Sequence, residues 1–270
     1  MAATPDNSTG TLDLPCRYYR VYTDDDVPCR EQNFDFVEQT LPLPAAQTAL
    51  VLVDVWATHY IDSWLQRAAD ITKAHIVPMM AAARRAGVLV VHAPSPFVVE
   101  RHHQASVPVT AAGAEAPDSW PPAAFRGIYR GGEHGAFGRR AEPRLTAAQA
   151  RYETELKIAD IAAPAAGDEV IATGQQLHEL LKARGMLHLV YAGFATNWCV
   201  IGRDYGIIAM NGRGYNIVLA RDATAGVEFH DSVEHETATQ IAIREIETKY
   251  GWSTTAADFV RAADNQGPVE

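Results

Sequence analysis

The thiol of Cys199 follows an apolar run, a glycine and a short polar bend, a pattern that can present a reactive thiol. Residues 190–200 read Val-Tyr-Ala-Gly-Phe-Ala-Thr-Asn-Trp-Cys-Val and continue into a stretch compatible with a helix. At a helix start, unpaired backbone N–H groups and the positive end of the helix dipole favour the thiolate, and the same groups can hold a developing oxyanion. A free cysteine is also commonly a small buried core residue. The bend alone therefore leaves both roles open.

A second reactive group, the carboxylate of Asp54, lies near the end of the nearly unbroken apolar run 49–55. Such a run is typical of a parallel strand covered on both faces. Ligands of an open parallel sheet bind beyond the carboxyl ends of its strands. Asp54, His92, Ser95 and Cys199 all lie at or just after expected strand ends, so they can converge despite their separation. Asp54 and Cys199 form a plausible base and nucleophile, although an aspartate at a strand end can instead cap the next helix.

The elements that must position these residues alternate between strands and helices, which predicts a doubly wound α/β fold. We expect a mostly parallel sheet of five to six strands with helices on both faces, in three layers. The expected strands are 49–55, 88–92, 168–172, 187–193 and 215–220, and the expected helices are 61–85, 175–183, 199–210 and 233–250. Pro78 should end or kink the first helix. A loop rather than a helix is expected after residues 93–96, which read Ala-Pro-Ser-Pro.

The 270 residues fit one large domain with an N-terminal extension. Residues 1–12 are expected to form a disordered tail and residues 13–46 a strand-pair extension, with strands at 13–22 and 34–43. Residues 47–262 would form the main domain, interrupted by a long irregular insertion at about 97–160. Its arginines and aromatic residues favour an ordered cover or an oligomer contact.

Composition excludes several classes of function. A formal net charge of −10 argues against a nucleic-acid partner, and no run reaches the ~18 apolar residues of a membrane span. Three cysteines, without metal-ligand or CxxC spacing, are typical of a reduced cytoplasmic protein. We expect a small-molecule substrate, no cofactor and a homo-oligomer, because the early strand pair and the insertion suggest edges buried between subunits.

Three segments together resemble the isochorismatase-like cysteine hydrolase superfamily, which includes nicotinamidases, carbamoylsarcosine amidohydrolases and isochorismatases. They are Asp54 after the strand 50–53, the Gly-Phe-Ala-Thr-Asn-Trp-Cys segment at 193–199, and the strand that ends in Arg-Asp-Ala-Thr at 221–224. The resemblance covers about residues 47–100 and 160–250. It implies that 47–262 is an isochorismatase-like hydrolase domain with a Rossmann-like sheet.

The resemblance also implies a mechanism. Asp54 takes the thiol proton, and Cys199 attacks an amide or related carbonyl to give a thioester that water hydrolyses, with Asp54 acting first as base and then as acid. A cis peptide bond is implied between Phe194 and Ala195, and the backbone N–H groups of Ala195 and Cys199 would form the oxyanion hole. The D-x-H motif and distant histidine that hold a metal in nicotinamidases are not found. His102 and His103 are read as loop residues, and no metal is predicted.

The main departure from the family pattern is a missing lysine. The family usually carries it soon after the third strand, but here residues 170–172 run directly into 173–177, Thr-Gly-Gln-Gln-Leu. Lys157 precedes that strand and does not match the motif. A cation ~4 Å from a thiolate contributes on the order of 4 kcal/mol at an effective dielectric near 20, so a replacement is expected. His59, His92 and Arg203 are the candidates, and His59 is the best placed by sequence and is assigned to the catalytic set.

The second departure is the segment Asp-Val-Trp-Ala-Thr-His at 54–59, where the family more often reads D-x-Q-x-D-F. Trp56 and Trp198 flank the two proposed catalytic residues. Together with His92, Ser95 and Arg203 they form the predicted substrate-binding set.

Two other functions remain open at this point. Vinyl-ether hydrolysis of the isochorismatase type is one, although the cysteine is usually absent from those enzymes. A non-catalytic ligand-binding or oligomer-forming protein on the same fold is the other, because the lysine is missing.

Overall fold

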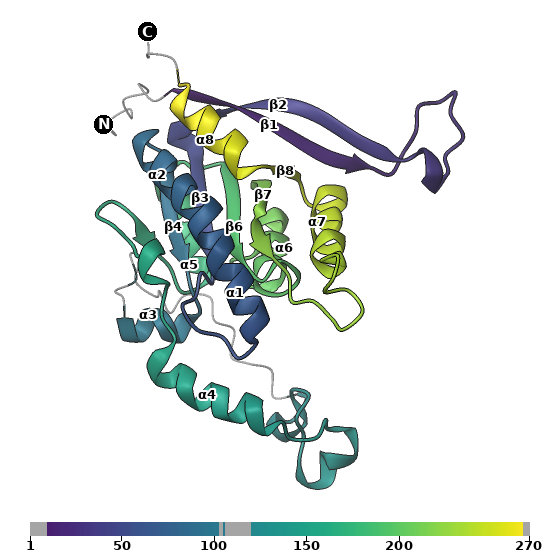
Figure 1. Cartoon of the computed structure of the whole chain (residues 1–270), viewed down its shortest axis with the longest axis vertical. Helices are drawn as coiled ribbons and strands as arrows, with labels where there is room; N and C mark the ends of the chain where they lie inside the picture. The colour runs from purple at the N-terminus through teal and green to yellow at the C-terminus, as the bar shows by residue number, and fades with distance from the viewer. Residues whose placement is uncertain (1–9, 103–104, 106–119, 267–270) are drawn as a thin grey trace.

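The centre of the protein is an eight-stranded sheet with the order β2-β1-β8-β7-β6-β3-β4-β5 (Figure 1). The computed structural model describes residues 10–102, 105 and 120–266. The strands are β1 (Thr11–Arg20), β2 (Asp35–Pro44), β3 (Thr48–Val53), β4 (Leu89–Ala93), β5 (Glu169–Val170), β6 (His188–Phe194), β7 (Asn216–Ala225) and β8 (Trp252–Thr254). Strands β3 to β8 pair in parallel, and β1 pairs antiparallel with both β2 and β8. The predicted α/β class is confirmed, with six parallel strands beside an N-terminal pair.

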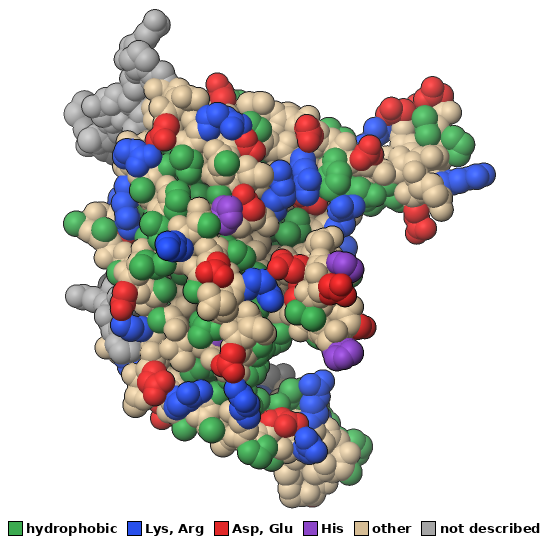
Figure 2. All heavy atoms as spheres, in the orientation of Figure 1, with side chains coloured by type: hydrophobic (Ala, Val, Ile, Leu, Met, Phe, Trp, Pro, Cys, Tyr) green, Lys and Arg blue, Asp and Glu red, His purple; other side chains and the backbone are tan. Residues whose placement is uncertain are grey.

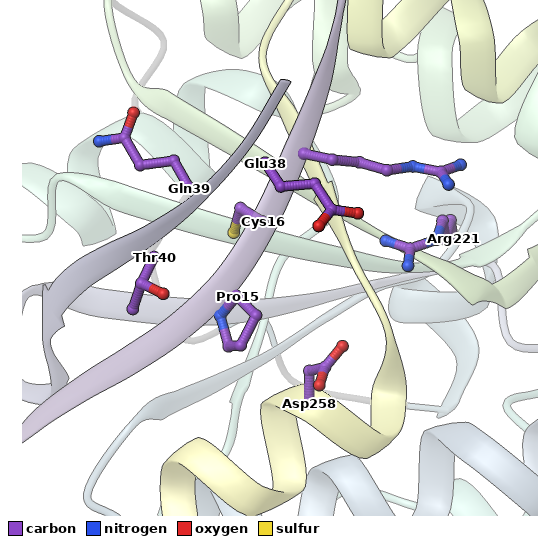
Figure 3. Close-up of a pocket in the computed structure, with 8 residues that line it drawn as sticks. Pro15, Cys16, Glu38, Gln39, Thr40, Arg221 and Asp258 are labelled. Atoms are coloured by element: carbon purple, nitrogen blue, oxygen red, sulfur yellow. The ribbon is translucent and has the colours of Figure 1, made fainter. Parts of the chain in front are cut away.

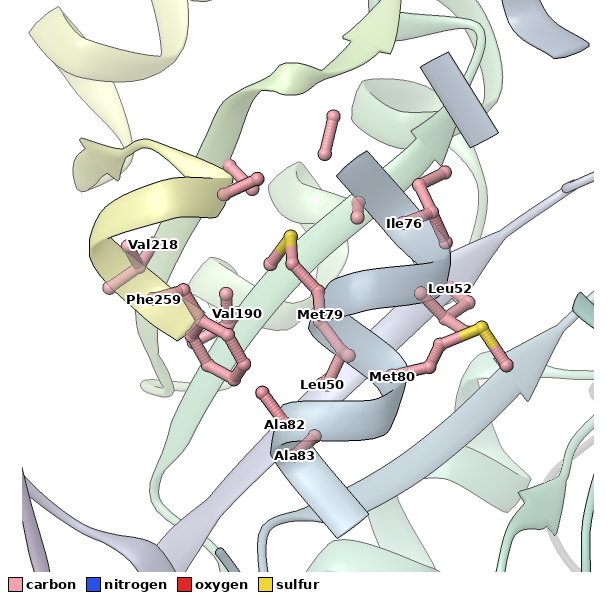
Figure 4. Packing of buried hydrophobic residues seen from close by; sticks show 14 of the residues in the cluster. Leu50, Leu52, Ile76, Met79, Met80, Ala82, Ala83, Val190, Val218 and Phe259 are labelled. Carbon is pink, nitrogen blue, oxygen red and sulfur yellow. The ribbon is translucent and has the colours of Figure 1, made fainter. Parts of the chain in front are cut away.

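Helices cover both faces of this sheet because alternate residues of its central strands enter two separate cores. The helices are α1 (Asp62–Ile71), α2 (Val77–Arg85), α3 (Pro96–His102), α4 (Pro143–Glu155), α5 (Gly174–Arg184), α6 (Ile207–Gly212), α7 (Thr237–Lys249) and α8 (Ala256–Asp264). Leu50 and Leu52 pack with α1, α2 and α8, where Met79 and Phe259 meet them (Figure 4). Val51, on the opposite face, packs with residues of α5, α6 and α7. The apolar run of β3 is continuous because neither face meets water.

Several elements differ from the sequence-based expectation. The helix expected at 61–85 is divided by a π-helical turn at Thr72–Ile76, and Pro78 lies in the first turn of α2, directly after it. The prediction of a loop after residue 95 is wrong, because α3 begins at Pro96. The helix expected at 199–210 is a π-helical turn, Thr196–Val200, followed by the separate helix α6. Strand β8 and helix α8 were not predicted.

The N-terminal strand pair forms one edge of the sheet. Its ladder runs from Thr11↔Pro44 to Arg20↔Asp35, while β1 meets β8 only at Arg17↔Ser253. Residues 1–9 of the expected tail lie outside the described residues. The insertion includes the 13-residue helix α4. No helix among the described residues is long and apolar enough to span a bilayer.

Candidate active site

The candidate site lies at the switch point of the sheet, where the connections from two neighbouring strands lead to opposite sides. Strands β3 and β6 are neighbours, but the chain proceeds from β3 to β4 on one side and from β6 to β7 on the other. The loops that leave β3 and β6 therefore diverge, and a crevice at such a switch point is the usual ligand site of an open parallel sheet. Asp54 directly follows β3, and the segment that carries Cys199 directly follows β6.

Asp54 is held at this switch point by its own backbone. Its φ of 46° lies in the left-handed region, which is uncommon outside glycine, and its N–H donates to the carbonyl of Ala93 at 3.2 Å. The residue is 1% exposed. A buried carboxylate in a strained conformation is maintained only when its surroundings dictate it, and such residues cluster at functional sites.

The bend after β6 depends on the absence of a side chain at Gly193. Its φ is 114°, and a Cβ there would lie 2.0 Å from the carbonyl oxygen of Val53. Close approach of β6 to the end of β3 therefore requires glycine. The peptide bond between Phe194 and Ala195 is cis, as predicted.

Two polar residues of the bend fasten the cysteine turn to the end of β7. The hydroxyl of Thr196 shares a buried hydrogen bond of 2.7 Å with the hydroxyl of Thr224. The Asn197 side chain exchanges two hydrogen bonds of 2.9 Å with the backbone of Val227. These contacts assign a structural role to the Thr-Asn pair that precedes Trp198, and they fix where the turn presents Cys199.

Cys199 and Asp54 lie close enough for each to shift the pKa of the other. Burial raises the Asp54 pKa to about 6, against the lowering effects of Arg203, Cys199 and Ser95. Burial and the negative charge of Asp54 raise the Cys199 pKa to about 12. Burial beside a carboxylate therefore favours the protonated form of the Cys199 thiol, against the thiolate that a helix start would favour. Asp54, which would accept that proton, is its neighbour.

Arg203 supplies the positive charge at this site. Its Nη2 lies 3.5 Å from Oδ2 of Asp54 and donates to the Ser95 hydroxyl at 2.7 Å. Ser95 in turn donates to Oδ1 of Asp54 at 3.3 Å. Arg203 also acts on the Cys199 thiol, where its charge and hydrogen bond lower the pKa. Because the Arg203 N–H bonds the Cys199 carbonyl at 3.1 Å, the two side chains project from one helical turn.

Contacts on two sides hold the turn that carries Arg203. The backbone N–H of Gly174, at the start of α5, donates to the Asp204 carboxylate at 2.7 Å. A Cβ at Gly174 would lie 1.9 Å from the Asp204 carbonyl oxygen. On the other side of Arg203, the Tyr205 hydroxyl donates to the Pro94 carbonyl at 3.1 Å. The start of α5 and the loop after β4 thus both contact the turn that carries Arg203.

The structure gives the other candidate cations different surroundings. His59 lies among aromatic rings, stacked on Tyr60 at a centroid distance of 4.5 Å and tilted against Trp64 at 4.3 Å. Burial lowers its pKa to about 4, so it is neutral near pH 7 and carries no compensating charge. His92 is buried beside Asp168, with Nε2 3.0 Å from Oδ2. Lys157 forms an exposed pair with Asp160. Sequence reasoning ranked His59 above Arg203, whereas the geometry favours Arg203.

The two tryptophans of the predicted binding set differ in exposure. Trp198 is 44% exposed beside the cysteine. Trp56 is half-buried, and its indole N–H is buried without a hydrogen-bond partner. Within residues 10–102, 105 and 120–266, no three His, Cys, Asp or Glu side chains are grouped as a metal ion would require.

Comparison with known proteins adds independent information. The chain matches the family model described as Isochorismatase domain over residues 48–258. It is 30% identical over 241 residues to the ureidoacrylate amidohydrolase RutB of Variovorax paradoxus (strain S110), which covers 83% of this chain and 84% of that protein. The ureidoacrylate amidohydrolase RutB of Caulobacter vibrioides (strain ATCC 19089 / CIP 103742 / CB 15) is 27% identical, covering 82% and 93%. A solved cysteine hydrolase from Pseudomonas syringae pv. phaseolicola 1448A superposes with a TM-score of 0.56 at 18% identity, covering 84% of this chain and 97% of that one. At this identity, that likeness concerns the fold.

Proposed function

Because the chain belongs to the isochorismatase family, we propose that this hydrolase cleaves an amide-like C–N bond of a small molecule through a thioester at Cys199. The observation that carries the proposal is the grouping of Asp54, Cys199 and Arg203 at the switch point of the sheet. These three groups are a base, a nucleophile and a cation, which is the set that thiol-dependent acyl transfer needs.

In the first half-reaction Asp54 accepts the proton of the Cys199 thiol as sulfur attacks the substrate carbonyl. The carbonyl oxygen becomes an oxyanion, for which we assign the backbone N–H groups of Ala195 and Cys199. Collapse of this intermediate breaks the C–N bond, and Asp54 returns the proton to the departing nitrogen. The products are a free amine or ammonia and a thioester on Cys199. A carboxyl pKa of about 6 is suited to both transfers near neutral pH.

In the second half-reaction a water molecule loses a proton to Asp54 and attacks the thioester carbonyl. The C–S bond then breaks, and the proton on Asp54 returns to sulfur. Each turnover consumes one water and restores the resting protonation of the pair. The positive charge of Arg203 opposes the desolvation cost of Asp54 and of the transient thiolate throughout.

We propose a ureido compound as the substrate class, on the basis of the two ureidoacrylate amidohydrolases to which the chain is similar. Of the predicted binding residues, Trp56 and Trp198 keep that assignment. The buried, unpartnered indole N–H of Trp56 is a donor suited to a ureido or amide oxygen. Ser95 and His92 have intramolecular partners, Asp54 and Asp168 respectively.

The test is release of ammonia or amine from a panel of ureido acids and primary amides. Wild-type protein should turn over at least one of them, and Cys199→Ala should abolish turnover while leaving the unfolding transition in place. Cys29→Ala is the matched control, because Cys29 is an exposed free cysteine and should not affect the rate. Full activity of Cys199→Ala would refute the nucleophile assignment.

A further inference from the structure

The N-terminal strand pair projects from the body of the protein as an arm (Figure 1). A hollow of about 340 Å³ separates it from the body, with Cys16, Glu38 and Gln39 on the arm side and Arg221 and Asp258 on the body side (Figure 3). Beyond the single bridge to β8, the arm is a two-stranded ribbon. A ribbon of two strands is marginally stable in water unless something packs against it.

The root of the arm is fixed in direction. Arg17 of β1 donates from Nε to the buried carboxylate of Glu247 on α7 at 2.8 Å. The guanidinium groups of Arg17 and Arg244 lie over the ring of Phe36 at 4.0 and 4.3 Å from its centroid. The arm is therefore held at its base while its outer end is left exposed.

The outer end, residues 21–33, is acidic and partly apolar; we refer to it as the arm tip. It contains three consecutive aspartates at 24–26 and Glu31 against the single Arg30, which is a formal charge of 1 − 4 = −3. Tyr22 is 70% exposed and Val27 is 40% exposed. Figure 2 shows acidic side chains around this end of the molecule.

A second projection, residues 123–140, has the opposite charge; we refer to it as the lower lobe. It contains four arginines, at 126, 130, 139 and 140, and one glutamate, Glu133, which is a formal charge of 4 − 1 = +3 in a chain whose total is −10. Tyr129 and Phe137 are 48% and 67% exposed. The lower lobe thus presents a basic surface with exposed aromatic side chains.

We propose that the arm tip of one copy of this chain docks on the lower lobe of a second copy, and that the reverse contact forms at the same time. In Figure 1 the arm leaves one end of the molecule and the lower lobe extends from the other. A two-fold axis normal to that view, passing between them, would bring each arm tip toward the partner's lower lobe. Opposite charges and exposed apolar side chains then meet in two equivalent contacts, as a self-complementary dimer requires.

A charge-exchange experiment tests this pairing. Asp25→Lys with Asp26→Lys reverses the arm tip, and Arg139→Glu with Arg140→Glu reverses the lower lobe. Sedimentation velocity of the full chain should give a dimer of the 29.4 kDa chain for wild type. Either double variant should weaken the dimer at least ~10-fold, because like charges then face each other in both contacts.

An equimolar mixture of the two double variants should restore the dimer. In that mixed pair, a lysine-bearing tip meets a glutamate-bearing lobe in one contact, and the wild-type pairing remains in the other. Recovery also shows that both variants are folded. Asp231→Lys with Glu234→Lys, on another exposed loop, is the matched control and should dimerise as wild type does. A monomeric wild type, a double variant that keeps wild-type assembly, or a mixture that stays monomeric would each overturn the proposal.

Discussion

Replacing Arg203 by methionine removes the charge beside Asp54 and Cys199, the proposed catalytic pair, while keeping much of the side-chain volume. The guanidinium lies 3.5 Å from the Asp54 carboxylate, which gives an attraction of about 5 kcal/mol at an effective dielectric of 20. The Arg203 side chain is 34% exposed, so solvent screening reduces this value, and halving it leaves roughly 2 kcal/mol. That energy corresponds to ~1.5 pK units.

Arg203 favours the ionised forms of two neighbouring groups, the Asp54 carboxylate and the Cys199 thiolate. Its loss should therefore raise the pKa of both groups. The acidic limb of the pH profile of kcat/KM should move up by ~1.5 pH units, and the rate at pH 7 should fall ~4-fold, because the ionised fraction of Asp54 then falls from about nine-tenths to about a quarter. Alkylation of the Cys199 peptide by iodoacetamide, followed by mass spectrometry, should likewise require a higher pH.

Two variants serve as controls for this substitution. Arg203→Lys keeps the charge and should lose less activity than Arg203→Met. Arg213→Met removes an exposed arginine that bonds Gln175 and should leave both pH profiles unchanged. If Arg203→Met kept wild-type kcat/KM and the wild-type pH dependence of alkylation, Arg203 would not be the cation that replaces the lysine.

Three further predictions concern the surroundings of the pair. Ser95→Ala removes the hydroxyl between Arg203 and Asp54 and should lower kcat ~10-fold, with a smaller change in KM. A lower Tm that accounts for all of the lost activity would instead indicate a purely structural role. Burial raises the Asp54 pKa to about 6 in the folded protein, so ionisation of Asp54 destabilises the fold as pH rises through 6. Asp54→Asn removes this destabilisation and should raise the free energy of unfolding by about 3 kcal/mol at pH 8 and hardly at all at pH 4. A gain in stability seen only at pH 4 would contradict this pH dependence. Gly193→Ala puts a Cβ 2.0 Å from a β3 carbonyl oxygen and should lower the free energy of unfolding, measured by denaturant titration, by on the order of 3 kcal/mol or more. Gly212→Ala, with open space around it, should leave the free energy of unfolding nearly unchanged.

The parts of the site that local sequence could predict are those that strand patterns determine. Asp54 and Cys199 follow buried runs whose carboxyl ends must meet at one edge of a parallel sheet. Gly193 and the cis bond were implied by a contiguous motif. By contrast, the distance from Arg203 to Asp54 depends on a contact between Gly174 and Asp204, which are 30 residues apart, and no local pattern encodes that contact.

The charge state of His59 also depends on contacts that local sequence does not reveal. Its position five residues after Asp54 suggested a catalytic cation, but the ring is buried among Tyr60, Trp64 and Tyr152, and burial lowers its pKa. Tyr152 comes from α4, inside the insertion that was expected to be irregular. The environment that neutralises His59 is therefore assembled by tertiary packing.

Strand β8 and helix α8, which were not predicted, differ in how clearly the sequence indicates them. Strand β8 has only three residues, which is too short for an alternating pattern. Helix α8 did carry a signal, because Thr255 and Asp258 have the spacing of a capping box, and the Thr255 hydroxyl accepts from the Asp258 N–H. This spacing in the sequence indicates a helix start at Thr255.

The most direct test of the account is capture of the covalent intermediate during turnover of a ureido substrate. Rapid acid quenching followed by peptide mass spectrometry should find the acyl group of the substrate on the Cys199 peptide and not on the Cys29 peptide. The adduct should be absent from Cys199→Ala and should disappear as the substrate is exhausted. Turnover that proceeds without an adduct, in a protein whose Cys199→Ala variant stays active, would contradict thioester catalysis at this cysteine.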